Sequence, residues 1–67
     1  KAVTVSADAV TQVITLQTTD TFTVLNFSDQ AQRFSGPVAY SNPVLCSVGS
    51  YTPGRVEAFG AIVLSVV

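Results

Sequence analysis

The sequence predicts an all-β fold: a small, single-domain β-sandwich or barrel of about six or seven short antiparallel strands spanning residues 1–67. β-Branched residues dominate, since Val occurs 12 times and Thr 8 times among 67 residues, and such side chains favour pleated sheets over helices. Runs of alternating apolar and polar residues recur roughly every 8–12 residues, with turn formers between them. No stretch of the chain predicts a helix.

The first two runs show the alternation of a strand most simply. Val3 and Val5 share one face of the first run, with Thr and Ser on the other face. In the second run Ile14 and Leu16 share a face, and Val13 points the opposite way. The predicted strands are residues 2–6, 11–17, 21–27, 32–34, 38–40, 44–48 and 55–67.

The third run changes phase along its length. Phe22 and Val24 point to one side, whereas Leu25 and Phe27 point to the other. Because side chains alternate strictly along a strand, this pattern predicts either a β-bulge or a strand that is buried on both faces.

The last run, residues 55–67, is the longest and is apolar on both sides after Gly60 interrupts it. Such a strand is either the central strand of a closed sheet or a strand that inserts into a neighbouring subunit.

Between the other runs, the residues before proline, Gly36 and Asn42, are expected in loop or edge structure. The strongest turn signal is residues 49–54.

Size and composition point to a protein that does not act alone. The chain has 67 residues, 48% of them hydrophobic and 10% charged, with one cysteine and no histidine. Domains this small are marginal without disulfides, metals or partner subunits, and this composition leaves only the partner subunits. The chain begins with Lys1 and has no methionine, so we expect a processed product or part of a longer chain.

Several classes of function are disfavoured. The net charge is −1 and the basic residues are scattered, so no surface that could neutralise nucleic-acid phosphates is predicted. The longest uninterrupted apolar stretch, residues 61–64, is far shorter than a membrane span. Without histidine and without paired carboxylates, we predict no enzyme activity, no catalytic residue, no metal site and no cofactor.

Two residues carry alternative interpretations. Cys46 is predicted to be a small apolar core residue, and an intermolecular disulfide is the alternative. Asn26 opens an Asn-Phe-Ser pattern that fits a glycosylation site, but its neighbours favour a role in shaping a turn.

The leading functional hypothesis is a structural subunit that self-assembles, such as a virion capsid or decoration protein or a building block of an extracellular filament. Its location would be extracellular or on the virion surface, and its partners would be copies of itself or other subunits of one particle. Apolar strand edges would pair with neighbours. The predicted assembly contacts are Val3, Val5, Ile62, Val63, Leu64, Val66 and Val67.

Two alternatives stay open. The chain could be a small extracellular binding module, lectin-like or adhesin-like, that uses loop residues Tyr40, Asn42 and Tyr51 as contacts. It could also be one fragment of a larger β domain that completes a sheet on another chain.

Overall fold

The computed structural model describes residues 3–37 and 39–66, which form seven β-strands and no helix. All pairings between the strands are antiparallel, so the predicted all-β antiparallel class is confirmed. The strands are β1 (Thr4–Asp8), β2 (Val13–Gln17), β3 (Thr21–Asn26), β4 (Gln32–Arg33), β5 (Tyr40–Cys46), β6 (Arg55–Val56) and β7 (Ala61–Val66).

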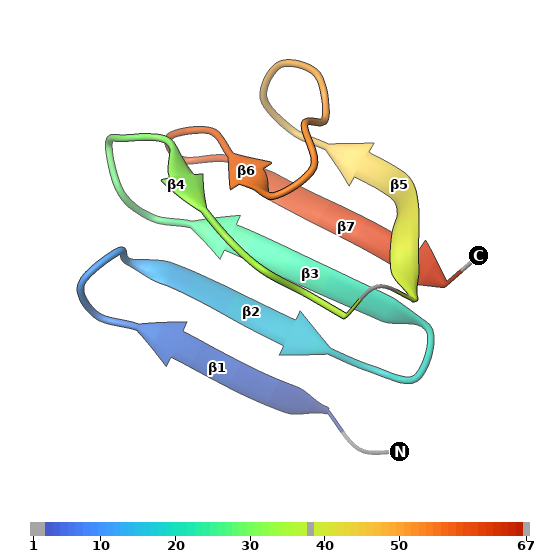
Figure 1. Cartoon of the computed structure of the whole chain (residues 1–67). Coiled ribbons are helices and arrows are strands. Elements are labelled where there is room, and N and C mark those ends of the chain that lie inside the picture. The colour runs from blue at the N-terminus through green and yellow to red at the C-terminus, as the bar shows by residue number, and fades with distance from the viewer. Residues whose placement is uncertain (1–2, 38, 67) are drawn as a thin grey trace.

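Five strands form one sheet in the order β1-β2-β3-β7-β5, and β4 and β6 form a separate two-stranded ribbon (Figure 1). The first three strands are a meander of two hairpins. Strand β7 then pairs with β3 on one side and with β5 on the other. The described strands do not close into a barrel, because β1 and β5 remain the two edges of an open sheet.

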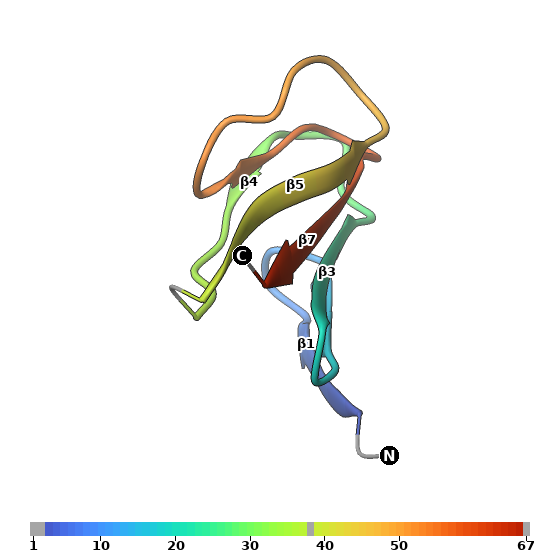
Figure 2. The ribbon, with the colours of Figure 1, turned by 90° about the vertical axis from the view of Figure 1, so that its right-hand side faces the viewer.

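The ribbon lies over one face of the sheet, which we call the inner face (Figure 2). Val56 of the ribbon is 1% exposed and belongs to the same cluster as the inner-face side chains of the sheet. Gly36 leads the chain across this face, where a Cβ atom would lie 2.7 Å from the Phe22 ring. The core consists of Val13, Phe22, Val24, Val56, Ile62 and Leu64.

Strand β3 resolves the change of phase in the third run. Its residues pair without interruption with β2 and with β7, so β3 contains no bulge. Phe22 and Val24 are buried on the inner face, and Leu25 lies between Val24 and Asn26 on the opposite side of the pleat. That opposite side carries Thr21 and Thr23 beside Leu25, and all three are half-buried, so β3 is buried on one face only and the expected burial on both faces is not found.

The last run is two strands rather than one. Residues 55–56 belong to the ribbon and residues 61–66 to the main sheet. The connection turns at Phe59, whose φ of 54° is left-handed, and the Gly60 N–H donates to the Glu57 carbonyl at 2.9 Å. When apolar and polar residues alternate both before and after a reversal of the chain, the sequence pattern alone does not distinguish two strands from one long strand.

The structure also extends the fifth strand through residues expected in a loop. Ser41, Asn42 and Pro43 lie within β5. This strand is an edge strand, which was the alternative expected for a residue before proline, and its pairing with β7 has two register shifts. Of the short extended run expected at 38–40, residue 38 lies outside the described residues.

A candidate interaction surface on the sheet

The side of the sheet away from the ribbon is rich in apolar side chains, and we call it the outer face. Its members alternate with the buried inner-face residues along each strand and face one another across the register. Val5 pairs with Leu16, and Ile14 with Leu25. The apolar members of the outer face are Val5, Ala7, Ile14, Leu16, Leu25, Leu45, Ala61 and Val63, and its polar members are Thr21, Thr23 and Ser65.

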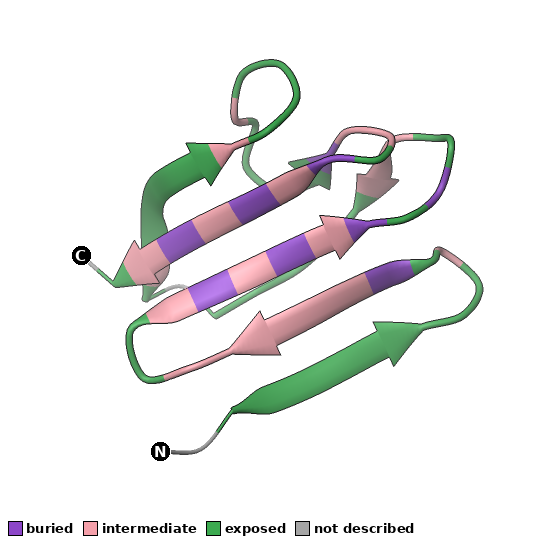
Figure 3. Ribbon diagram, turned by 180° about the vertical axis from the view of Figure 1, so that it is seen from behind, coloured by how far each residue is buried: buried purple, intermediate pink, exposed green. Residues whose placement is uncertain are grey.

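No described segment of the chain covers the outer face. Figure 3 views the sheet from this side, with the short strands of the ribbon and the segment that crosses the sheet lying behind β3 and β7. Val5 is 61% exposed and Leu45 is 50% exposed. Ile14, Leu25 and Val63 are half-buried.

The outer face also lacks charge among its described residues. Uncharged, mainly apolar patches of a few hundred Å² on a protein surface are often sites of contact with another molecule. Two large aromatic side chains, Phe27 and Phe59, are exposed next to the ends of β3 and β7. Their backbone N–H groups donate to the carbonyls of Gln12 and Ser28, at 2.9 Å and 3.1 Å, which fixes the chain at that end of the sheet.

The predicted assembly contacts divide between the two faces. Val5 and Val63 lie on the outer face, and Val3 and Val66 are exposed. Val67 lies outside the described residues.

Two further predicted contacts, Ile62 and Leu64, are buried in the core at 2% and 3% exposure. Their side chains are therefore not available to a neighbouring subunit. The backbone of β7 is paired on both sides, since this strand lies in the interior of the sheet. Alternation alone could not assign Ile62 and Leu64 to the covered face, because the face opposite them is apolar too.

The sequence analysis missed Ile14, Leu16, Leu25 and Leu45 as surface residues. The signal was present, because Leu25 follows the Phe22 and Val24 pair in the opposite phase. A strand with apolar residues in both phases needs two partners. The ribbon supplies only one.

The two tyrosines that were predicted as loop contacts, Tyr40 and Tyr51, pack against the core, and Tyr40 is the first residue of β5. The Tyr40 hydroxyl donates to the Thr18 carbonyl at 2.6 Å, and its ring centroid lies 6.0 Å from that of Phe22. Tyr51 is half-buried and packs against the same core. Asn42 is exposed, and its Nδ2 lies 3.1 Å from the Ser65 hydroxyl oxygen.

Asn26 holds the turn after β3 to the ribbon. It is 2% exposed, and its Nδ2 donates to the carbonyls of Gln30, Val56 and Glu57 at 2.8, 3.3 and 2.9 Å. Its Oδ1 accepts from the Ser28 N–H at 2.9 Å. The interpretation as a turn-shaping residue is confirmed. The folded chain already uses the amide nitrogen to which a glycan would be attached.

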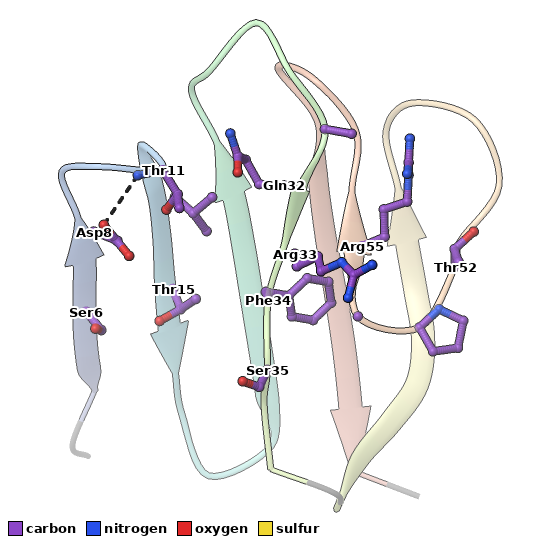
Figure 4. Close-up of a pocket in the computed structure, with 14 residues that line it drawn as sticks. Ser6, Asp8, Thr11, Thr15, Gln32, Arg33, Phe34, Ser35, Thr52 and Arg55 are labelled. Carbon is purple, nitrogen blue, oxygen red and sulfur yellow. Dashed lines mark hydrogen bonds between the residues drawn. The ribbon is translucent and has the colours of Figure 1, made fainter.

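An open cleft of about 910 Å³ lies on the inner side, between β1 and β2 and the chain around β4 and β6 (Figure 4). The ribbon is too short to cover the first two strands, so their inner faces line this cleft. Hydroxyl groups of Ser6, Thr11 and Thr15 stand on one side, and Arg33 and Arg55 on the other.

Two of the three charged residues that line the cleft, Asp8 and Arg55, make local contacts. Among its described lining residues Asp8 is the one carboxylate, and its Oδ1 accepts from the N–H groups of Val10 and Thr11 at 2.9 and 3.3 Å. Arg55 Nε donates to the carboxylate of Glu57 at 2.9 Å, and this hydrogen bond raises the pKa of the arginine above its ordinary value. The cleft offers hydroxyl groups and a capping carboxylate, without a paired base and nucleophile among these residues.

Cys46 is half-buried and packs against the core, where it pairs with Ile62 in the register. Its Sγ contacts the Val48 carbonyl oxygen at 3.4 Å. Within the described part of the chain, no group of three His, Cys, Asp or Glu side chains is arranged to hold a metal ion.

Compared with known proteins, the chain matches no family model, no curated protein and no solved structure. The described residues also include no helix long and apolar enough to cross a membrane.

Proposed function

We propose that this chain is a non-enzymatic structural subunit that self-assembles by packing its outer face against a second protein layer. The observation that supports the proposal is the uncovered, uncharged apolar surface formed by Val5, Ile14, Leu16, Leu25 and Val63. In this arrangement the second layer of the predicted sandwich comes from a neighbouring subunit. The ribbon covers only the inner face.

The physical driving force is burial of apolar area. Sheets pack face to face about 10 Å apart, with the side chains of the facing layers interdigitated. Each square ångström of apolar surface removed from water contributes about 25 cal/mol. The outer face carries no charge that would have to be desolvated, so this gain is not offset by burial of unpaired ions.

The kind of particle that we propose is the one predicted from the sequence. A chain with 10% charged residues has few means to keep an apolar surface solvated on its own. A capsid or decoration subunit, or the building block of an extracellular filament, would be covered by its neighbours. Its partners would be copies of itself or other subunits of the same particle, at a virion surface or outside the cell.

The alternative of a lectin-like or adhesin-like module rested on tyrosines in loops. Tyr40 and Tyr51 both pack against the core, and Tyr40 donates its hydroxyl hydrogen bond to the Thr18 carbonyl. Both rings are partly buried, which leaves less of each ring free for contact with a partner. The self-assembling subunit is therefore the function that we propose.

Sedimentation velocity tests the proposal across a concentration series from micromolar to submillimolar. We expect the unaltered chain to form oligomers and Val63→Lys to sediment as a smaller species, because a lysine at the centre of the outer face cannot be buried without its charge being desolvated. The matched control is Val10→Lys, at a position that is 92% exposed in the turn between β1 and β2. A folded monomer at every concentration for the unaltered chain would refute the proposal.

A further inference from the structure

The two edges of the main sheet differ in how they are protected against pairing. Edge strand β5 contains Pro43, which has no N–H to donate, and its pairing with β7 has two register shifts. Both features are devices that prevent an edge from accepting another strand. The β5 edge is therefore closed to further pairing.

Strand β1 has none of these features. All five of its residues pair with β2 in an uninterrupted register, and all five are exposed. The strand contains no proline, no lysine and no arginine, and its one charge, Asp8, lies at its end. A regular, exposed edge of this kind is able to accept a further strand.

Hydrogen bonds at the ends of β2 show which backbone groups of β1 point outward. The Phe27 N–H donates to the Gln12 carbonyl, and the Thr18 N–H donates to the Thr21 carbonyl, both at 2.9 Å. Hydrogen-bonded and non-hydrogen-bonded pairs alternate in an antiparallel ladder, so the even-numbered residues of β2 bond to β3 and Thr15 bonds to β1. Ser6, the partner of Thr15, then points its backbone groups inward.

The outward backbone groups of β1 are consequently those of Val5 and Ala7. Their side chains lie on the outer face, while the side chain of Ser6 lies on the inner side and lines the cleft. The edge thus presents two donors and two acceptors, placed symmetrically about Ser6.

We propose that β1 pairs with β1 of a second copy of this chain, antiparallel and about a two-fold axis at Ser6. Val5 of one copy and Ala7 of the other then exchange N–H···O=C hydrogen bonds, and the same exchange occurs on the other side of the axis. The result is a continuous ten-stranded sheet in which both outer faces lie on the same side. This inference rests on the proposed function, because it supplies one of the contacts of the assembly.

The area of the outer face gives a reason for this pairing. Five strands of five to seven residues present a face of roughly 450 Å². A standard stable interface needs about 800 Å² from each partner. Pairing at β1 joins two outer faces into one surface of about that size, which a second such pair can cover.

The side chains of β1 also favour a second copy as the occupant. In the proposed register Thr4 lies opposite Asp8 of the second copy, so a hydroxyl faces the only charge of the strand. The two Asp8 carboxylates are four residues apart along the ladder, which separates them by about 14 Å. At that distance their repulsion is screened at physiological ionic strength.

Disulfide crosslinking tests the register. In a Cys46→Ser background, Ser6→Cys places two thiols at a non-hydrogen-bonded pair on the axis, where the Cα separation suits a disulfide. We expect mild oxidation to convert most of this variant into a covalent dimer. The matched control, Thr4→Cys in the same background, places its thiols about 14 Å apart and should stay uncrosslinked. Equal crosslinking of both variants, or none at Ser6, would overturn the proposed register.

Removal of one outward donor tests the pairing without a crosslink. Ala7→Pro deletes an N–H that points away from β2, so the monomer keeps its fold, and Ala7→Ser is the control that keeps the N–H. We expect the dissociation constant of the edge contact to rise at least tenfold for Ala7→Pro and to change little for Ala7→Ser. Thermal unfolding of each variant verifies that the monomer is intact.

The outcomes separate the two proposals. We expect Val63→Lys to leave a β1-linked pair, Ala7→Pro to leave a weaker face-packed species, and the double variant to be a monomer. If Ala7→Pro assembles like the unaltered chain, the edge pairing is refuted and the proposed function stands. If an unrelated β-strand peptide but no second copy adds to β1, the edge is receptive and the occupant proposed here is refuted. If the unaltered chain is monomeric, the proposed function fails.

Discussion

The inner and outer faces of the five-stranded sheet are built from the same strands and the same kinds of residue, yet only one of them is covered. In β3 the inner residue Val24 is fully buried, and its neighbour Leu25 on the outer side is half-buried. The ribbon of β4 and β6 makes this difference, since it places Val56 against the inner face. Burial of the inner face is achieved within one chain, whereas burial of the outer face requires another molecule.

The inner face itself is covered unevenly. Toward β3 and β7 it packs as a core, and toward β1 and β2 it opens into the cleft lined by Ser6, Thr11 and Thr15. The side chains of the inner face follow this pattern. Those under the ribbon are apolar, and those beyond its end carry hydroxyl groups. On the outer face the apolar residues continue out to Val5 on the edge strand, although no described segment covers them. This mismatch supports the proposal that the outer face is an interaction surface.

The largest expected change in the free energy of unfolding comes from comparing two adjacent residues of β7, Ile62 on the inner face and Val63 on the outer face. Ile62→Ala removes a fully buried side chain from the inner face and should lower the free energy of unfolding by about 2–5 kcal/mol. A 67-residue domain has only about 3–10 kcal/mol in total, so this variant should lose a large part of its stability. Val63→Ala, one residue later on the outer face, should cost under about 1 kcal/mol in the monomer. Urea denaturation at low concentration measures both, and equal losses would refute the distinction between the faces.

The next largest difference in the free energy of unfolding is expected between two asparagines, the buried Asn26 and the exposed Asn42. Asn26→Ala should cost about 1–3 kcal/mol, because the buried carbonyls of Val56 and Glu57 lose a donor. Asn42→Ala, which removes an exposed contact to Ser65, should change the free energy of unfolding by less than about 0.5 kcal/mol. Thermal unfolding followed by circular dichroism measures the difference. If Asn26→Ala unfolds at the same temperature as the unaltered chain, this residue does not hold the ribbon to β3.

The smallest effect on stability belongs to the far end of the outer face. Leu45→Lys alters an exposed side chain of β5 and should change the free energy of unfolding of the monomer by no more than about 0.5 kcal/mol. Its effect should be visible in association instead, because the new charge would have to be buried in the assembly. Sedimentation velocity detects that change. Loss of monomer stability by several kcal/mol would instead place Leu45 in the core.

Part of the fold could be predicted because it depends on short-range patterns. The third strand was expected at 21–27 and is Thr21–Asn26, and its two-sided apolar character was recognised from the phase of Leu25. The last run was expected as one long strand because its reversal near Phe59 and Gly60 interrupts the apolar pattern by only a few residues. The residue before Pro43, Asn42, was expected in loop or edge structure, and it lies with Pro43 in an edge strand, where the missing donor of the proline faces no partner.

The sequence by itself determined that the chain is all-β, that several of its strands are apolar in both phases, and that Asn26 shapes a turn. These properties are local, since alternation and turn chemistry act over a few residues. Only the tertiary structure decided which phase is buried, because that depends on where the short ribbon packs after two long connections. It also decided that β7 is an interior strand and that β1 is the open edge, since the order of strands in a sheet is set by contacts between distant residues.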